Sequence, residues 1–300
     1  MINREPRKPR EHHRWLSLSK PLVKVISTSS MTVSELLLHI VVWASFFITI
    51  TVLLYIIGFI LVKGLPYVRP SLFALHYTSE NVSLLPALVS TVFITLISLL
   101  IAVPLSVGAA VYLVEYAKRG NRFVSLIRIT TETLAGIPSI IYGLFGMLFF
   151  VSFLHWGYSV LAGSLTLSIM ILPLVIRSTE EALLAVSDTW REASLALGAG
   201  KLRTVFKIVL PAARPGILAG IILAIGRIVG ETAALIYTAG TVAQIPFGPL
   251  QSARTLSVHM YALSSEGLHT GEAYATAVVL MLLVIVINSI SARLARNITI

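Results

Sequence analysis

The sequence predicts an all-α membrane protein with six transmembrane helices. Of its 300 residues, 56% are hydrophobic and only 12% are charged, and the mean hydropathy is strongly positive. This composition lies outside the range of ordinary soluble domains. About 20 apolar residues are needed to cross a bilayer as a helix, and six stretches are long enough. They are Leu36–Val62, Leu84–Val114, Leu134–Leu154, Val160–Ile176, Gly216–Gly240 and Ala273–Ala292.

The placement of the basic residues predicts the orientation. With the N-terminus inside, 19 of the 23 Lys and Arg residues fall in the two tails and the two inner connections. Only Lys63, Arg69 and Arg254 fall outside. This asymmetry is the one described by the positive-inside rule. We therefore expect a multi-pass membrane protein with both termini in the cytoplasm, and we attribute the net charge of +10 to topology and not to nucleic-acid binding.

The N-terminal region predicts an anchored chain. Residues 1–35 are expected to form a basic cytoplasmic tail that is free or lies on anionic lipid headgroups. The first transmembrane helix, 36–62, is too long for a signal peptide, which predicts an uncleaved anchor. The sequence contains no Cys, so disulfides and thiolate metal sites are excluded, and no His pair has the spacing of a metal site.

A short polar insert between the fourth and fifth spans contains its own helix signals. Thr189 and Glu192 fit a T-x-x-E capping box, and Gly198 suits the left-handed residue that ends a helix. Pro211 is expected to stop the helix that follows. Four residues at helical spacing give one largely apolar face: Trp190, Ala193, Ser194 and Leu197. Such a face either docks on a partner protein or lies at the lipid headgroups.

The fifth predicted span contains two charges. Arg227 and Glu231 are four residues apart, which places them on one face of a continuous helix. A charge at bilayer depth costs at least about 2.5–3.5 kcal/mol, so it should face protein or water. Two interpretations remain open and are compatible: an internal ion pair that locks helices, or a fixed positive charge for an oxyanion, with Glu231 orienting the guanidinium. The whole face is small, polar or charged: Gly216, Gly220, Ala224, Arg227, Glu231, Ala234 and Thr238.

Two motifs resemble those of ABC importer permeases. The insert reads E-A-x-x-x-x-G-x(9)-I-x-L-P from Glu192 to Pro211, which is similar to the cytoplasmic coupling loop of these permeases. Residues 223–233, L-A-I-G-R-I-V-G-E-T-A, are similar to the fifth-span signature of phosphate ABC permeases. Further segments are similar to the PstA-type subunit: 135–140, 143–145, 175–180, 257–261, 264–267 and 272–277.

The resemblance covers about residues 84–296 and implies the type I ABC importer permease (MetI-like) fold in the plasma membrane of a prokaryote, with a coupling loop at 177–215. It implies half of the translocation path for inorganic phosphate, paired with a PstC-type permease, two PstB-type ATPase subunits and a phosphate-binding protein. ATP and Mg would be bound by the ATPase, and this chain would have no cofactor and no catalytic role. Arg177 and Arg227 are the implied phosphate-path residues, although Arg177 also fits a headgroup anchor.

The predicted site residues form two groups. The substrate path takes Arg227, Glu231, Arg177 and Thr238. The ATPase coupling site takes Trp190, Glu192, Ala193, Leu197, Gly198, Leu210 and Pro211. The outer connection 241–272 is the best candidate surface for a binding protein.

Two other functions are considered. An ABC permease for another oxyanion, such as molybdate or sulfate, would use the same embedded arginine. An ion-driven secondary transporter is disfavoured by the coupling motif and by the lack of an inverted repeat. No G-x(4)-G-K-[ST] loop, nucleophile elbow or metal triad points to an enzyme.

Overall fold

The computed structural model describes residues 33–118, 120 and 122–298, with side chains as far as residue 293. Most of the predicted basic tail, residues 1–32, lies outside this range. The chain divides into two units, residues 1–56 and 57–300. The described part of the first unit belongs to α1 (Val33–Gly64), whose side chains are exposed over residues 34–56. A helix that is apolar on all sides suits a membrane span.

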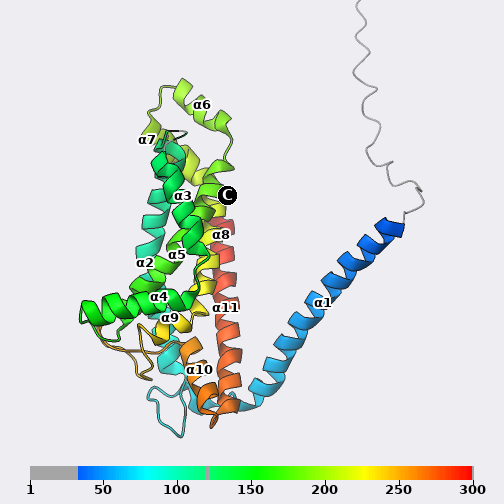
Figure 1. Ribbon diagram of the computed structural model, residues 1–300, viewed down its shortest axis with the longest axis vertical. Helices are drawn as coiled ribbons and strands as arrows, with labels where there is room; N and C mark the ends of the chain where they lie inside the picture. Colours follow the sequence, from blue (N-terminus) through cyan, green and yellow to red (C-terminus); the bar gives the residue numbers. More distant parts are fainter. Residues whose placement is uncertain (1–32, 119, 121, 299–300) are drawn as a thin grey trace, which may run out of the picture. The chain divides into compact units, whose positions relative to one another are not determined.

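The second unit is a helical bundle (Figure 1). Its long helices are α2 (Leu85–Val111), α5 (Val160–Leu184), α8 (Leu210–Val229) and α11 (Thr270–Ile298). Its shorter helices are α3 (Arg122–Ala135), α4 (Ser139–Gly146), α6 (Asp188–Ala196), α7 (Lys201–Thr204), α9 (Ala233–Ile236) and α10 (Leu256–Glu266). Three π-helical turns extend or join them: Tyr112–Tyr116, Met147–Phe153 and Val205–Val209.

Five helical segments of the described residues are long and apolar enough to cross a membrane, and a bent pair could supply a sixth. The five segments are Ser34–Tyr67, Leu85–Tyr116, Val160–Leu184, Lys201–Val229 and Thr270–Arg293. The all-α membrane fold predicted from the sequence is confirmed. Two of the predicted spans, however, differ from the structure.

The third predicted span, Leu134–Leu154, is not one straight helix. α3 and α4 meet at an angle of 101°, and Figure 1 shows α4 running across the bundle. The break lies before Pro138, whose ψ of 140° is extended and whose ring removes a backbone donor. α4 and its π-helical extension have 8 and 7 residues. Together they reach about 22 Å, less than the hydrocarbon core of about 30 Å.

The fifth predicted span, Gly216–Gly240, is also wrong in its limits. The helix starts at Lys201 and ends at Val229, and the chain becomes helical again only in α9. Pro211 does not stop the helix, because the preceding π-helical turn Val205–Val209 shifts the backbone hydrogen bonds where the proline has no N–H to give.

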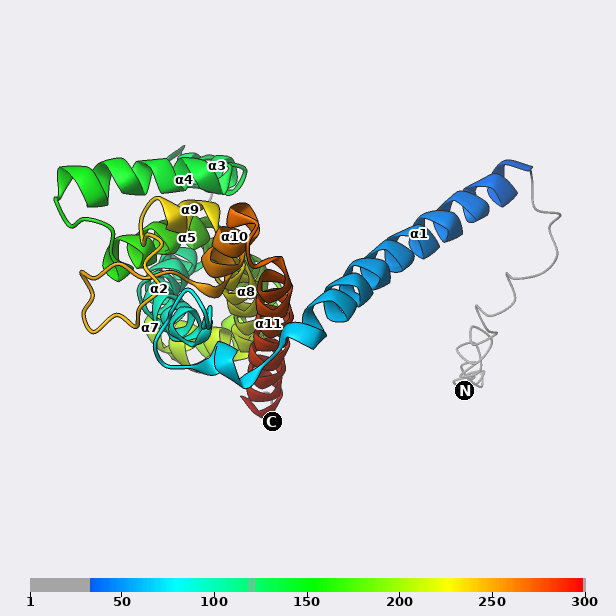
Figure 2. The same cartoon turned by 90° about the horizontal axis from the view of Figure 1, so that it is seen from below.

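α5 is the central helix of the bundle. It contacts α2, α3, α4, α8 and α9 (Figures 1 and 2). A Cβ atom on Gly216 would lie 2.6 Å from the Cβ of Ala182, and one on Gly220 would collide with the side chain of Ser178. Close approach of α8 to α5 therefore requires glycine at both positions. The first half of the predicted face of small and polar residues, at Gly216 and Gly220, is therefore a packing surface against α5.

Serine hydrogen bonds join α2 to α5. Ser98 donates to the carbonyl of Ser164 over 3.1 Å, and Ser168 donates to the carbonyl of Ser98 over 3.2 Å. Small polar side chains allow two helices to approach closely and to hydrogen bond in an apolar environment. The pair α2–α5 is thus fixed in register as well as packed.

In the connection between α9 and α11, a buried arginine and a buried histidine contact the same tyrosine. The guanidinium of Arg254 lies 4.6 Å from the centre of the Tyr77 ring, and the imidazole of His259 on α10 lies 6.1 Å from the same ring. Burial lowers the pKa of His259 to about 3, the charge of Arg254 lowers it as well, and the Val82 backbone opposes both. Neither ring nitrogen of His259 makes a hydrogen bond within the described residues. His259 is therefore neutral at physiological pH.

We predict that this histidine makes folding stability pH-dependent. The unfolded chain takes up a proton near pH 6.5, whereas folded His259 does not until about pH 3. The free energy of unfolding should therefore fall as the pH decreases below about 6.5, by at most about 1.4 kcal/mol per pH unit. The thermal unfolding midpoint of the detergent-solubilised protein, measured from pH 7.5 to 4.5, checks this.

The variant His259→Gln should show a weaker pH dependence than the wild-type chain. The exposed His76 supplies the control, because His76→Gln should keep the wild-type dependence. The variants are compared by how steeply the thermal midpoint changes with pH and not by the midpoint itself, since glutamine at a buried position lowers stability at every pH. Equal slopes for wild type and His259→Gln would contradict a buried neutral histidine.

Candidate functional site

Two broken helices meet on one side of the bundle, where α4 lies (Figure 2). α4 packs against α9, and a Cβ atom on Gly143 would lie 2.8 Å from the Cα of Ala234. At the break between α3 and α4, the hydroxyl of Tyr142 donates to the carbonyl of Leu134 over 2.8 Å. The same carbonyl also accepts from the backbone N–H of Ile137 over 3.1 Å, so the end of α3 is closed by a backbone and a side-chain hydrogen bond. Interrupted helices at membrane depth are typical of places where proteins handle ions, so this meeting point is the candidate path site.

Glu231 is bound to the backbone at the second break. Its Oε1 accepts a hydrogen bond of 3.0 Å from the N–H of Ala234, in the first turn of α9. Its main-chain carbonyl accepts one of 2.6 Å from Ser257 Oγ on α10. The residue is only 9% exposed. Glu231 therefore satisfies groups that the interruption of the helix leaves free.

Arg227 lies in the last turn of α8 and is half-buried. The predicted shared face with Glu231 is wrong, because the helix ends at Val229, between the two residues. No ion pair in the described part of the chain joins Arg227 to a carboxylate. Ala224 and Ile228, which flank it on α8, belong to the same buried apolar cluster as Tyr142, which places this end of α8 near the α3–α4 break. The structure thus leaves a permanent positive charge beside both breaks.

Thr238 follows α9 and is fully buried. Its Oγ1 donates to the carbonyl of Ala234 over 2.7 Å, and its methyl group lies where a Cβ on Gly146 would have to go, at 2.7 Å. Within this chain, the side chain of Thr238 contacts α4 and not an open space.

Arg177 lies on α5 beyond the predicted end of the fourth span, since α5 continues to Leu184. Its guanidinium is paired with Glu181 at 3.2 Å and with Glu132 of α3 at 3.5 Å. The Arg177 side chain is 59% exposed, and exposed ion pairs of this kind contribute little to stability. The structure does not bring Arg177 and Arg227 together: the Gly220 contact beside Arg177 lies about two turns of α8 away from Arg227.

The polar insert between α5 and α8 forms α6, but this helix begins earlier than the sequence predicts. The cap is Ser187, whose Oγ accepts a hydrogen bond of 3.3 Å from the N–H of Thr189, in place of the predicted Thr189–Glu192 capping box. Ser187 competes successfully because Asp188 then lies in the first turn, where the helix dipole favours a negative charge. The prediction for Gly198 is confirmed, since its φ of +82° is left-handed.

α6 has an inner and an outer face. Ser194 is buried and its Oγ lies 2.9 Å from Thr204 Oγ1 of α7, so it belongs to the inner face and not to the predicted apolar face. Trp190 and Leu197 are 56% and 89% exposed, and Glu192 and Ala193 are exposed as well. The outer face therefore presents an apolar surface with one carboxylate. Leu210 and Pro211 are half-buried where α8 begins.

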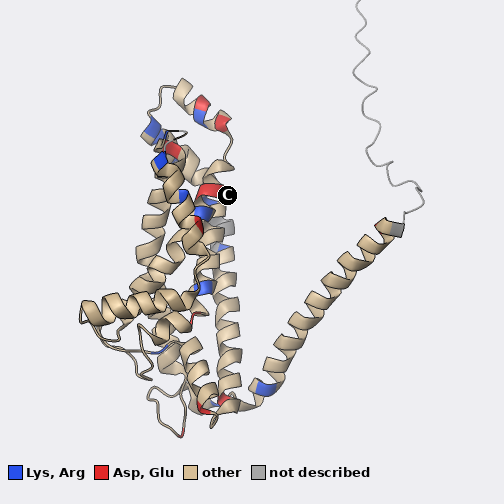
Figure 3. Ribbon diagram, in the orientation of Figure 1, with Lys and Arg blue, Asp and Glu red and all other residues tan. Residues whose placement is uncertain are grey.

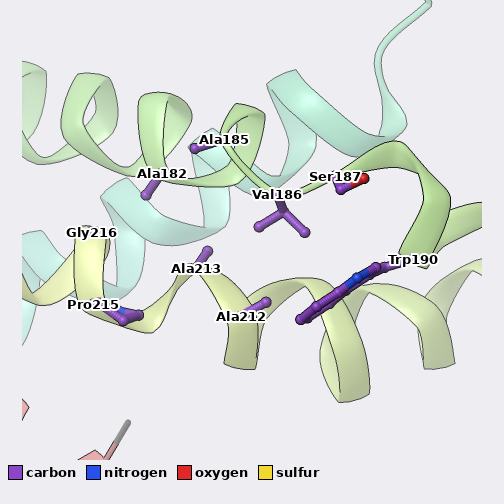
Figure 4. Close-up of a pocket in the computed structure, with 9 residues that line it drawn as sticks. All are labelled: Ala182, Ala185, Val186, Ser187, Trp190, Ala212, Ala213, Pro215 and Gly216. Carbon is purple, nitrogen blue, oxygen red and sulfur yellow. The ribbon is translucent and has the colours of Figure 1, made fainter. Parts of the chain in front are cut away.

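A hollow of about 350 Å³ lies between the end of α5 and the start of α8. Figure 4 shows the indole of Trp190 extending from α6 across its opening, close to Ala212. The other lining residues are mostly small: Ala182, Ala185, Val186, Ser187, Ala213, Pro215 and Gly216. Trp190 thus contacts its own chain with one edge while more than half of its surface remains free.

Sequence reasoning missed the residues that support these sites. Tyr142 and Ser257 bind backbone carbonyls at the breaks, and nothing in a helical pattern marks a hydroxyl that serves a distant carbonyl. Arg191 and Glu115 form the shortest ion pair of the described residues, at 2.8 Å. Their separation by 76 positions hides the pair from local motifs.

Comparisons with known proteins agree with this arrangement. Residues 102–300 match the family described as "Binding-protein-dependent transport system inner membrane component". A probable ABC transporter permease of Bacillus subtilis, YqgI, is 40% identical over 194 residues, which cover 60% of this chain and 66% of that protein. The phosphate transport system permease protein PstA of Haemophilus influenzae is 38% identical over 189 residues, covering 62% and 66%.

A second PstA protein, from Mycobacterium leprae, is 41% identical over 161 residues, which cover 54% of this chain and 52% of the relative. The chain therefore spans about half to two thirds of the length of the curated relatives that it matches.

Solved structures show the fold. A chain in an inward-facing structure of the MetNI methionine ABC transporter superposes with a TM-score of 0.54 at 24% identity, covering 70% of this chain and 92% of that one. A chain of a bacterial alginate ABC transporter gives 0.66 at 16% identity, covering 89% and 96%. The fold is that of an ABC importer permease, of the MetI-like type. The chain belongs to the family of binding-protein-dependent transport system inner membrane components.

Proposed function

We propose that this chain is the permease subunit of an ATP-driven importer and forms half of the translocation path for inorganic phosphate. The observation that carries the proposal is Arg227, a half-buried arginine without a carboxylate partner among the described residues, located where two broken helices meet. Arginine remains protonated and its planar fork matches the oxygens of a tetrahedral anion. An anion that passes this point would meet a charge that the protein itself does not neutralise.

The choice of phosphate rests on the relatives. Arg227 alone would serve molybdate or sulfate equally well. Among the similar proteins, those of Haemophilus influenzae and Mycobacterium leprae are phosphate permeases by name. This favours phosphate over another oxyanion as the substrate of the whole importer.

The other path residues take different roles in this proposal. Glu231 holds the break in position through its bonds to Ala234 and Ser257, and so fixes where Arg227 lies. Arg177 is proposed as a second path residue, nearer to the end of α5 that leads into α6. A phosphate there would compete with Glu132 and Glu181 for its guanidinium. Thr238 supports the packing of α4 against α9.

The proposed partners are a PstC-type permease, two PstB-type ATPase subunits and a phosphate-binding protein. ATP and Mg are proposed to bind to the ATPase and not to this chain, which has no catalytic role. The outer face of α6 supports this assignment, because Trp190 and Leu197 expose apolar area that a docked protein would cover. The outer connection 241–272 is proposed to receive the binding protein.

Replacement of Arg227 tests the path. Because Glu231 is bonded to the backbone and not to Arg227, Arg227→Gln should leave membrane insertion and assembly intact. Uptake of radiolabelled phosphate by proteoliposomes that contain the complete importer should fall at least about 100-fold, since one charge-assisted bidentate contact contributes a few kcal/mol. Arg214→Gln, an exposed arginine on the same helix, is the control and should transport normally.

Glu231→Gln separates the two roles further. Glutamine keeps an oxygen that can accept the Ala234 N–H, so this variant should retain assembly and most of its uptake. If Arg227→Gln imports phosphate at the wild-type rate in an assembled complex, Arg227 is not part of the path.

The docking role of α6 is tested at the glycine that ends it. Valine disfavours the left-handed conformation of Gly198 by about 1–2 kcal/mol, so Gly198→Val should displace Leu197 and weaken ATPase binding. Gly200→Ala is the matched control, because Gly200 has an ordinary φ of −70° and free space at its Cβ. Pull-down of the ATPase and its stimulated hydrolysis are measured. Normal binding and normal uptake by Gly198→Val would remove this loop from the coupling role.

The orientation is proposed from the basic residues, many of which lie toward the end of the bundle that carries α6 and α7 (Figure 3). The chain has no native Cys, so single cysteines report accessibility directly. Ser264→Cys, exposed on α10, should react with an impermeant maleimide in intact cells, and Ala196→Cys, exposed on α6, should react only after the cells are opened. The reverse pattern would contradict cytoplasmic termini.

A further inference from the structure

One side chain connects α6 to two other helices. The guanidinium of Arg191 donates from Nε and Nη2 to Glu115 Oε1, at 3.0 and 2.8 Å. Glu115 lies in the π-helical turn Tyr112–Tyr116 that extends α2. Both side chains are largely buried, with 16% of Arg191 and 8% of Glu115 exposed. The pair is therefore shielded from solvent and stronger than a surface ion pair.

The same guanidinium binds the end of α5. Nη2 donates to the carbonyl of Leu183 at 2.8 Å, and Nη1 donates to the carbonyl of Val186 at 2.6 Å. These carbonyls belong to the last turn of α5 and the residues after it, where the regular i to i+4 hydrogen bonds end; the Leu183 carbonyl also accepts from the N–H of Val186 over 3.3 Å. A cation at this position also interacts favourably with the negative end of the helix dipole. A further bond to Asp188, at 3.0 Å, fixes the guanidinium relative to α6 itself.

The other contacts of α6 are weaker or belong to the next helix. Ser194 reaches only Thr204 of α7, and α7 in turn places Lys201 5.2 Å from the ring of Tyr116. Beyond Ser194, the helix presents its outer face. Since Arg191 contributes charge-assisted bonds to both α2 and α5, it is the stiffest link between α6 and the bundle that the described residues show.

We propose that Arg191, with Glu115 as its partner, is a positioning residue that ties α6 to the adjoining ends of α2 and α5, so that a displacement of α6 moves both helices together. The inference rests on the proposed function, in which an ATPase docks on the outer face of α6. Arg191 points away from that face and serves transmission, not docking. The helices that it holds matter for transport, because α5 carries Arg177 and packs against α8, which carries Arg227.

The experiment separates docking from transmission. The complete importer is reconstituted with wild type, Arg191→Met, Arg191→Lys and Glu115→Gln, and with Arg122→Met as the control at an exposed arginine. Bound ATPase, ATP hydrolysis and phosphate uptake are measured on the same preparations. Arg191→Met should bind the ATPase within twofold of wild type and hydrolyse ATP, while phosphate imported per ATP falls at least tenfold. In Arg191→Lys the phosphate imported per ATP should lie between the values of wild type and Arg191→Met, because an ammonium reaches fewer of the acceptors.

Glu115→Gln should have a smaller effect than Arg191→Met, since the amide oxygen can still accept from Arg191. An unchanged ratio of phosphate to ATP in Arg191→Met would overturn the inference, as would a loss of uptake that only follows a loss of bound ATPase. If wild type itself shows no ATP-dependent phosphate uptake, the proposed function fails instead.

A spin-label measurement tests the inference without any substrate. Labels at Leu184→Cys on α5 and Ala196→Cys on α6, both exposed, are placed in the assembled importer whose partners have no free thiol. We expect one narrow distance distribution, the same without nucleotide and after trapping with ATP and vanadate. With Arg191→Met the distribution should broaden or change on trapping. If it stays as narrow and constant in the variant as in wild type, Arg191 does not hold α6 to α5.

Discussion

The close packing of α5 against its neighbours is the constraint on which the rest of the bundle depends. α5 is the only helix of the described residues that contacts α2, α3, α4, α8 and α9 together. On the α8 side, Gly216 and Gly220 leave no room for even a methyl group. On the α2 side, serine hydroxyls exchange hydrogen bonds with backbone carbonyls. In lipid there is little hydrophobic force between helices, so contacts of this kind must supply the association energy. A bundle held in this way tolerates neither larger residues nor a shift in register at α5.

The helices could be predicted from the sequence because apolar length is a local property, but their interruptions could not. A run of apolar residues from 134 to 154 has the composition of a span, and only tertiary contacts reveal that it bends before Pro138. At the bend, the carbonyl of Leu134 accepts hydrogen bonds from the N–H of Ile137 and from the hydroxyl of Tyr142. At Pro211 the sequence predicts a helix end that the structure does not have, since the π-helical turn before it allows the helix to continue through the proline. In both cases the outcome is decided by where backbone hydrogen bonds find partners, and those partners lie outside the regular i to i+4 pattern that helix prediction assumes.

At the site, too, single residues with a local signal could be predicted from the sequence, whereas their hydrogen-bond partners could not. Arg227 is visible in the sequence because a charge in an apolar run is costly and therefore informative, and Gly198 is visible because a left-handed residue has few alternatives. Spacing alone assigned Glu231 to Arg227, whereas the structure assigns its carboxylate to the Ala234 N–H. A helix break at low dielectric leaves several N–H groups free, and an acid nearby is drawn to them. Arg227 is thereby left without its expected partner, which strengthens the argument for an anion at that position.

A continuous set of stiff contacts leads from α6 to this arginine. Arg191 binds the last carbonyls of α5, α5 is in backbone-level contact with α8 through the two glycines, and α8 ends two residues after Arg227. Helices transmit displacement along their length because their backbone bonds resist stretching, whereas the break after Val229 allows α9 to remain with α4. A displacement of α6 would pass to α5, which contacts α8 on one side of this break and α4 and α9 on the other. Continuity of contacts is not by itself coupling; what the structure adds is that the break separates Arg227 on α8 from Glu231 and α9, so these parts of the site are connected to α5 by separate contacts.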